Sequence, residues 1–200
     1  MVRPRQFLDK DLLAVARACF IEHGPSCSTA LIAEQAGVSQ ATLFKRFGTK
    51  RLLLRAALKP EPPLELLALI SAGPDERPIP DQLRDIAAAL LAMFERLLPC
   101  VMTLWAAGED PAGMLPECDG PPPPVQARLL LRAWFERVTD GGRARPGDAD
   151  ARAMAFIGAC KERSFQHHLF PDAATQPSAA AYAQSLVDTI WAGCAPAETP

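Results

Sequence analysis

The segment STALIAEQAGVSQATLFKRFGTK, residues 28–50, holds two short helical patterns separated by a glycine. Ser28 and Ser39 each stand directly before one of these patterns, where serine is favoured as a helix N-cap. Gly37 closes the first pattern in a position that suits the left-handed conformation, which glycine adopts at low cost. Val38 follows as an apolar residue in the turn. The segment therefore predicts a helix, a tight turn and a second helix.

This order of elements is that of a helix-turn-helix, whose second helix enters the major groove of DNA. Apolar residues must hold the two helices at their crossing angle, and the segment offers Ile32, Ala33, Val38, Leu43 and Phe47. The alternative is a pair of short core helices joined by a turn. The charge and the exposed residue types favour the first interpretation.

We expect DNA contacts from the three helix starts and from the exposed face of residues 40–47. The expected contact residues are Ser28, Thr29, Ser39, Gln40, Ala41, Thr42, Phe44, Lys45, Arg46, Thr49 and Lys50. Glutamine can reach a base edge, alanine and threonine methyls can touch a thymine methyl, and lysine and arginine can meet phosphate or guanine. The free N–H groups after Thr49 suit a phosphate. Solvated surface charge is the alternative for the basic residues.

Charge is divided unevenly along the chain. Residues 1–60 carry ten Lys and Arg against four Asp and Glu, a net charge of +6. Residues 61–200 carry eleven basic and nineteen acidic residues, a net charge of −8, so the overall value of −2 hides a basic N-terminal part. This asymmetry predicts a polyanionic partner for the basic part, which the acidic remainder would orient toward DNA.

Helical periodicity extends over most of the chain, and strand signals are absent because no run alternates apolar and polar residues with β-branched enrichment. We predict an all-α protein of about nine helices. The expected ranges are 9–23, 29–35, 40–47, 50–58, 64–70, 81–98, 101–107, 125–139, 148–170 and 178–192. Pro99 is expected to interrupt the chain between the sixth and seventh ranges.

Several classes of protein are not expected. The first ten residues are charged and contain no secretory signal, and the longest apolar stretch, residues 97–108, is too short to span a membrane. The six cysteines are scattered without a CxxC pair, which indicates reduced, buried thiols in a cytoplasmic protein. We expect no membrane association, metal, cofactor or enzymatic activity.

Residues 10–58 resemble the TetR family of bacterial transcription regulators. Residues 32–39, IAEQAGVS, look like the family's IAxxAGVS turn. Residues 42–44, TLF, and 47–50, FGTK, look like its TLY and F-x-(S/T)-K elements, and all occur in the right order. Phe44 stands where the family usually has tyrosine, so a phosphate contact through that hydroxyl is lost.

The resemblance implies a three-helix DNA-binding head at residues 1–60, with the helix-turn-helix at 28–47. It also implies a larger helical domain at 61–200 that dimerises through its last two helices and binds an effector. We therefore expect a homodimeric repressor that binds a palindromic operator in double-stranded DNA and is released by a small molecule. An effector-independent activator or a DNA-architectural protein remains the alternative.

The C-terminal region gives weaker indications. Methionine and aromatic residues suit an adaptable pocket for a hydrophobic or aromatic effector, although their helical spacing makes plain core packing the default explanation. The residues expected to line this pocket are Met93, Phe94, Met102, Trp105, Trp134, Phe135 and His168. The last two helical patterns are strongly apolar and suggest a bundle between subunits. The expected interface residues are Phe156, Phe165, Tyr182, Leu186, Ile190 and Trp191.

A third alternative is a helical thiol redox sensor. Cys160, Ser164 and His168 are spaced four residues apart and would share one helix face. Two such steps place the outer residues roughly 12 Å apart, too far for direct proton transfer. Pocket or interface lining is therefore favoured for these residues.

Overall fold

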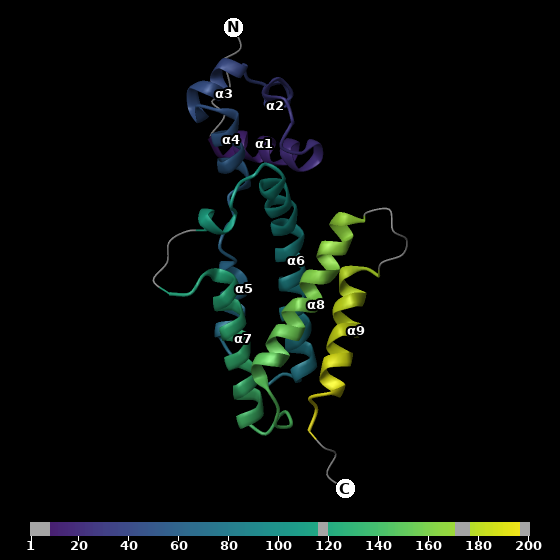
Figure 1. Cartoon of the computed structure of the whole chain (residues 1–200). Helices are drawn as coiled ribbons and strands as arrows, with labels where there is room; N and C mark the ends of the chain where they lie inside the picture. The colour runs from purple at the N-terminus through teal and green to yellow at the C-terminus, as the bar shows by residue number, and fades with distance from the viewer. Residues whose placement is uncertain (1–8, 116–119, 171–176, 197–200) are drawn as a thin grey trace. The chain divides into compact units, whose positions relative to one another are not determined.

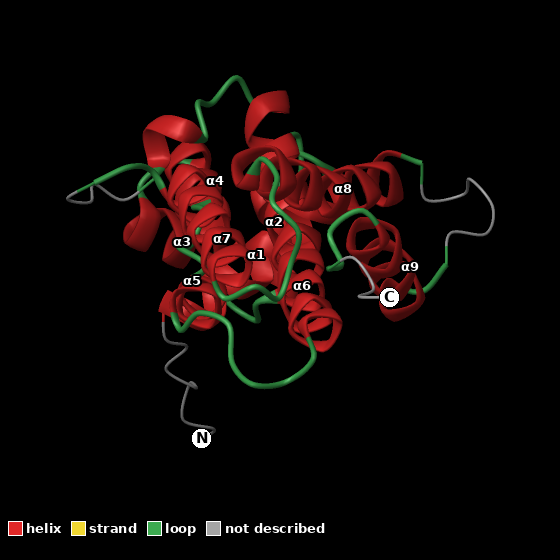
Figure 2. Ribbon diagram, turned by 90° about the horizontal axis from the view of Figure 1, so that it is seen from below, coloured by secondary structure: helices red, strands yellow, loops and turns green. Residues whose placement is uncertain are grey.

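The computed structural model describes residues 9–115, 120–170 and 177–196. Within these ranges the chain forms nine α-helices and one short 3₁₀ helix, with no strand (Figure 2). The all-α prediction is confirmed. The chain divides into two compact units: unit 1 is residues 1–61 and 99–115, and unit 2 is residues 62–98 and 116–200.

Together with residues 99–115, unit 1 contains four helices near the N-terminus (Figure 1). They are α1 (Asp9–His23), α2 (Thr29–Gln35), α3 (Gln40–Phe47) and α4 (Lys50–Leu58). Fully buried side chains from each helix meet in one core, among them Phe20, Ile32, Leu43 and Leu58. Burial of such side chains stabilises the unit by roughly 1.5–3 kcal/mol each. This core fixes the faces that α2 and α3 leave exposed.

Unit 2 contains the longer helices. They are α5 (Leu64–Ser71), most of α6 (Ile79–Ala106), α7 (Pro123–Asp140), α8 (Ala149–Leu169) and α9 (Ala179–Ala192). Helix α7 packs against both α5 and α8, and α9 packs against α8. The core of unit 2 gathers large apolar side chains from α6, α7 and α8, including Leu90, Trp134, Phe135 and Phe156. The rings of Trp134 and Phe135 meet edge to face, with their centroids 5.4 Å apart.

Helix α6 continues through Pro99, so the two helices expected at 81–98 and 101–107 are a single helix. Proline has no N–H, and the carbonyl of Glu95, four residues earlier, therefore lacks its usual helical donor. The His168 Nε2 atom lies 3.2 Å from that carbonyl oxygen and replaces the missing donor in its Nε2–H tautomer. This contact between α8 and α6 gives a physical reason why the helix is not ended by its proline.

As a single helix of 28 residues, α6 is long and apolar enough to cross a membrane by length and composition alone. Part of the helix nevertheless packs inside the protein, and 39% of its most apolar window of 18 residues is buried. Leu83 and Leu90 lie in the core of unit 2, and Cys100 and Leu104 lie in the core of unit 1.

Candidate nucleic-acid interface

The turn between α2 and α3 has the conformation that the sequence predicts. Gly37 adopts a φ of 64°, and the Val38 N–H donates to the Ala33 carbonyl at 3.0 Å across the turn. This hydrogen bond closes the end of α2 in the manner of a Schellman motif. Val38 packs against the core of unit 1, so the turn is anchored from inside.

Three predicted contact residues are N-caps. The hydroxyl oxygens of Ser28, Ser39 and Thr49 accept hydrogen bonds from the N–H groups of the residues three positions later, at 3.1–3.2 Å. Each cap defines where its helix begins. The Ser39 and Thr42 hydroxyl oxygens are also 2.9 Å apart, so Thr42 is part of the cap of α3.

The outer face of α3 is small, polar and cationic. Gln40, Ala41, Phe44 and Lys45 are exposed, while Leu43 between them is buried in the core. Lys45 has no hydrogen-bond or ion-pair partner among the described residues. The Thr29 hydroxyl donates to Gln40 Oε1 at 3.4 Å, which leaves the Gln40 amide N–H groups available as donors. This face offers hydrogen-bond donors and one unneutralised charge.

Arg46 differs from Lys45 in its surroundings. Its Nη1 atom lies 3.1 Å from Asp9 Oδ1, so the guanidinium is paired with the first residue of α1. The pair joins α3 to α1 across 37 positions of sequence. Arg46, expected to contact DNA, is therefore already engaged within unit 1.

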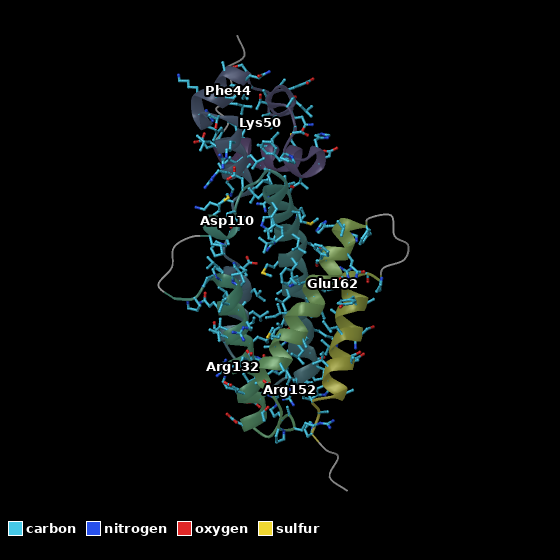
Figure 3. All side chains as sticks on the ribbon, viewed as in Figure 1. Phe44, Lys50, Asp110, Arg132, Arg152 and Glu162 are labelled. Carbon is cyan, nitrogen blue, oxygen red and sulfur yellow. The ribbon has the colours of Figure 1, made fainter. Side chains whose placement is uncertain are left out.

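The junction between α3 and α4 depends on Gly48. Its φ of 78° and ψ of −77°, with the Thr49 N–H donating to the Phe47 carbonyl at 3.0 Å, make a γ-turn that is strained for other residues. Lys50 then begins α4, at a helix N-terminus where an anion is favoured. Figure 3 labels Phe44 on α3 and Lys50 at the start of α4.

A buried carboxylate, missed by sequence reasoning, holds α4 in unit 1. The Glu109 side chain is 2% exposed and binds Arg51 through Oε1 and Arg55 through Oε2, the latter at 2.9 Å. The hydrogen bond from Arg51 and the charge of both arginines hold the pKa of Glu109 below its usual value. No local sequence pattern predicts this contact, because Glu109 lies 58 positions from Arg51 and 54 positions from Arg55 in the sequence.

The residues expected to line an effector pocket do not share one environment. Phe94, Trp134 and Phe135 lie in the core of unit 2, and Met93 packs against it. Trp105, in the part of α6 that belongs to unit 1, is 64% exposed. Met102 lies in the same part of α6 and is half-buried. Phe94, Trp134 and Phe135 therefore act as core packing, whereas Trp105 does not.

Cys160, in the cluster with Ser164 and His168 considered for redox chemistry, is unsuited to such chemistry. This thiol is fully buried on α8, and burial raises its pKa to about 12. A thiol with so high a pKa stays protonated at neutral pH and is a poor nucleophile. His168 is occupied by the Glu95 carbonyl of α6. Cys160 and His168 therefore both serve packing or hydrogen bonding within the protein.

Most residues expected at a subunit interface pack inside unit 2. Phe156 has no exposed surface, and Tyr182 donates its hydroxyl proton to the Ala159 carbonyl at 3.0 Å. The half-buried residues that pack against the same core are Tyr182, Leu186, Ile190 and Trp191. Phe165 is half-buried on α8. Met154, which sequence reasoning passed over, is 57% exposed on α8.

Comparison with known protein families gives a match to the N-terminal helices. Residues 12–57 match the model of the bacterial regulatory proteins of the tetR family. The match spans α1 to α4, including the turn and the capped helices described above. No curated protein sequence matches the chain.

Solved structures share the fold over nearly the whole chain. A protein from Mesorhizobium loti, assigned to the TetR family of transcriptional regulators, is 18% identical with a TM-score of 0.63, over 94% of this chain and 96% of that one. SmeT, the repressor of the Stenotrophomonas maltophilia multidrug efflux pump SmeDEF, is 18% identical with a TM-score of 0.61, over 96% and 93%.

A third structure, the TetR regulator SCO0520 from Streptomyces coelicolor, is 22% identical with a TM-score of 0.55, over 95% of this chain and 99% of that one. At these identities the structures inform about fold, while the family model informs about the N-terminal helices. Residues 12–57 therefore match the TetR family model, and the chain as a whole has the fold of these solved TetR-family regulators.

Proposed function

We propose that the protein is a repressor that binds a palindromic operator as a homodimer and is released by a small-molecule effector. The observation that carries the proposal is the exposed face of α3, where Gln40, Ala41, Phe44 and Lys45 stand on a helix held by two caps and a buried core. A rigid helix of this kind presents base readers and phosphate contacts in a defined register.

Within this face the residues have different roles. Gln40, with its amide donors available, reads a base edge, whereas Lys45 and Lys50 contact phosphates. Arg46 holds α3 against α1 through Asp9 and adds its charge to the local field. Phe44 contributes an apolar contact, because its side chain is 42% exposed and carries no hydroxyl. The Ser28 and Thr49 cap hydroxyls donate their protons to the DNA backbone, whereas the Ser39 hydroxyl shares a hydrogen bond with that of Thr42. Thr29 orients Gln40.

Operator binding by point variants tests this assignment. The operator is first selected from a random DNA pool by the full-length protein. Gln40→Ala should then cost about 1–3 kcal/mol at one base position, whereas Lys45→Ala should weaken all sequences and lower the salt slope by about one unit. Lys161→Ala on α8 is the matched control, with an exposed lysine in unit 2. Unchanged affinity in both α3 variants would contradict the proposal.

Dimerisation is assigned to the exposed faces of α8 and α9, because their inward residues are already packed in the protomer. Met154→Glu should weaken the dimer at least tenfold in sedimentation experiments, because it puts a charge on this face. Leu64→Glu on α5, at a side chain that is 68% exposed, is the control. If Met154→Glu leaves the dimer intact and Leu64→Glu weakens it, the dimer interface lies on another surface.

Effector release is supported by the neighbour SmeT, for which a complex with triclosan is known. Triclosan is therefore the first probe to titrate into the protein–operator complex. Loss of operator binding, together with a rise in transcription from an operator-controlled reporter, supports a ligand-released repressor. Operator affinity that stays constant across triclosan and a panel of hydrophobic ligands supports the effector-independent alternative.

A further inference from the structure

Unit 1 contains an open groove of about 490 Å³ beside the start of α4. We call it the α4 groove. Its lining comes from the loop between α1 and α2, from α4, and from the end of α6 and the residue pair that follows it. All of these segments belong to unit 1. The volume lies within the range of about 300–1,000 Å³ that small-molecule sites occupy.

Most of the surface that lines the groove is apolar, although Ser26 also lines it. Pro25 lines it from the loop before α2, Leu54 from α4, and Ala106 and Ala107 from the end of α6. Two consecutive alanines leave open a volume that larger side chains would fill. An apolar ligand body that covers this surface gains roughly 25 cal/mol for each Å² removed from water.

Two cations and one carboxylate line the groove, namely Lys50, Arg51 and Glu109. Lys50 and Arg51 line it at the start of α4. Among the described residues, neither the Lys50 Nζ atom nor the two Nη atoms of Arg51 have a hydrogen-bond or ion-pair partner. Arg51 uses Nε to bind Glu109. The two carboxylate oxygens of Glu109 are occupied by Arg51 and Arg55, so the charge left over around the groove is positive.

An apolar surface beside a net positive charge is complementary to a molecule with one anionic group and a hydrophobic body. We propose that the α4 groove binds an amphipathic monocarboxylate, whose carboxylate pairs with Lys50 and Arg51 while its body covers Leu54 and Ala107. A guanidinium beside an ammonium binds a carboxylate by charge-assisted hydrogen bonds. The site is separate from the residues that the sequence suggested for an effector pocket, because none of them lines it.

Binding to this groove has a consequence for DNA that rests on the proposed function. Lys50 is there a phosphate contact, so a carboxylate on Lys50 competes with the DNA backbone. The ligand would weaken operator binding directly from within the DNA-binding unit. This competition differs from effector release through unit 2, because it needs no change in unit 2.

The test uses the full chain with 2-naphthoate as probe, 2-naphthamide as the neutral probe of the same shape, and inorganic phosphate. Binding is followed by calorimetry and by the methyl signals of Leu54 in NMR spectra. We expect saturable binding of 2-naphthoate with shifted Leu54 signals, and at least tenfold weaker binding of the amide and of phosphate. Equal binding of acid and amide, or of naphthoate and phosphate, would overturn the proposal.

Two variants locate the site. Ala107→Trp fills the groove and Lys50→Met removes one cation at similar length, and each should weaken 2-naphthoate binding at least tenfold. Ala68→Trp on α5 and Lys59→Met after α4 are the controls, since both residues are exposed and lie outside the groove. Lys50→Met keeps the test informative if the tryptophan variant misfolds. Naphthoate binding that survives both changes would place the probe elsewhere and overturn the assignment.

Titration of 2-naphthoate into the operator complex separates the two proposals. Weaker operator binding in the unchanged protein, abolished by Ala107→Trp, supports competition at the groove. If 2-naphthoate binds the groove and operator affinity is unchanged, competition is refuted while the ligand site stands. If the operator assignment itself fails, the calorimetric and NMR results on the free protein still decide the ligand site.

Discussion

Units 1 and 2 are both helical, yet their sequences specify them in different ways. In unit 1 the helix starts and the turn between α2 and α3 are set by single residues, the caps Ser28, Ser39 and Thr49 and the glycine at 37. In unit 2 the caps Asp148 and Ser178 begin α8 and α9, but the helices are predicted from apolar periodicity, and the same periodicity fits a packed core or a ligand cavity. Local chemistry therefore identifies the DNA-binding unit, whereas composition does not identify an effector site.

The largest expected effects test whether both units have closely packed cores. Phe20→Ala in unit 1 and Trp134→Ala in unit 2 should each cost about 3–5 kcal/mol, because both rings are buried. Urea unfolding followed by circular dichroism measures the change. Leu64→Ala, at an exposed position on α5, should stay within about 0.5 kcal/mol. A loss below about 1 kcal/mol for Trp134→Ala would favour a cavity in unit 2 over packing.

Two glycines of positive φ allow the units to be compared at the backbone. Gly48→Ala should cost about 1–3 kcal/mol, because it strains the γ-turn before α4 and brings a Cβ within 3.3 Å of Leu52. Gly142→Ala in unit 2, with no atom within 4 Å of the added Cβ, should cost about 1–2 kcal/mol. Operator affinity should fall in the first variant alone. An equal fall in both would mean that the α3–α4 junction has no special role.

Removal of one cap in each unit should have a smaller effect. Ser39→Ala and Ser178→Ala each delete a side-chain hydrogen bond to a backbone N–H, at 3.1 Å for α3 and 3.2 Å for α9, and should cost about 1 kcal/mol of stability. Thermal unfolding checks this loss. Only Ser39→Ala should also weaken operator binding, because it loosens the start of α3. An equal loss of affinity from Ser178→Ala would contradict a local role for the cap.

The smallest effects concern acid stability. Glu109 in unit 1 and Asp75 in unit 2 both have a pKa below the usual value, Glu109 through Arg51 and Asp75 through the Arg77 backbone N–H. A carboxyl group whose pKa is lower in the folded than in the unfolded state adds stability at neutral pH. This stability is lost as the pH falls from the usual pKa, about 4.5 for Glu109 and 3.8 for Asp75, through the lower pKa of the folded state.

Glu109→Gln and Asp75→Asn should each flatten the fall of unfolding free energy between about pH 5 and 2, as measured by urea titrations across this range. Glu109→Gln should have the larger effect, because its side chain is 2% exposed and that of Asp75 is 51% exposed. Equal slopes in both variants and the unchanged protein would show that neither carboxylate is stabilised by its partners.

The sequence predicts helices α1 to α4 of unit 1 but not that residues 99–115 form part of unit 1. Caps and glycine turns act over three or four residues, and the helix bounds of α1 to α4 match those expected. Pro99 misled the prediction, because the residue that compensates for it, His168, lies 73 positions from Glu95. The aromatic residues were recognised as apolar, but periodicity does not show whether space is left between them.

The sequence by itself determined the all-helical class, the helix-turn-helix and the charge division, because these depend on neighbouring residues and on simple sums. Tertiary structure alone decided that Arg46 pairs with Asp9, that Glu109 binds two arginines of α4, and that α6 passes through its proline. It also decided the groove beside Lys50. These features require segments far apart in the chain to meet, and the free energy that brings them together belongs to the packed core rather than to any local stretch.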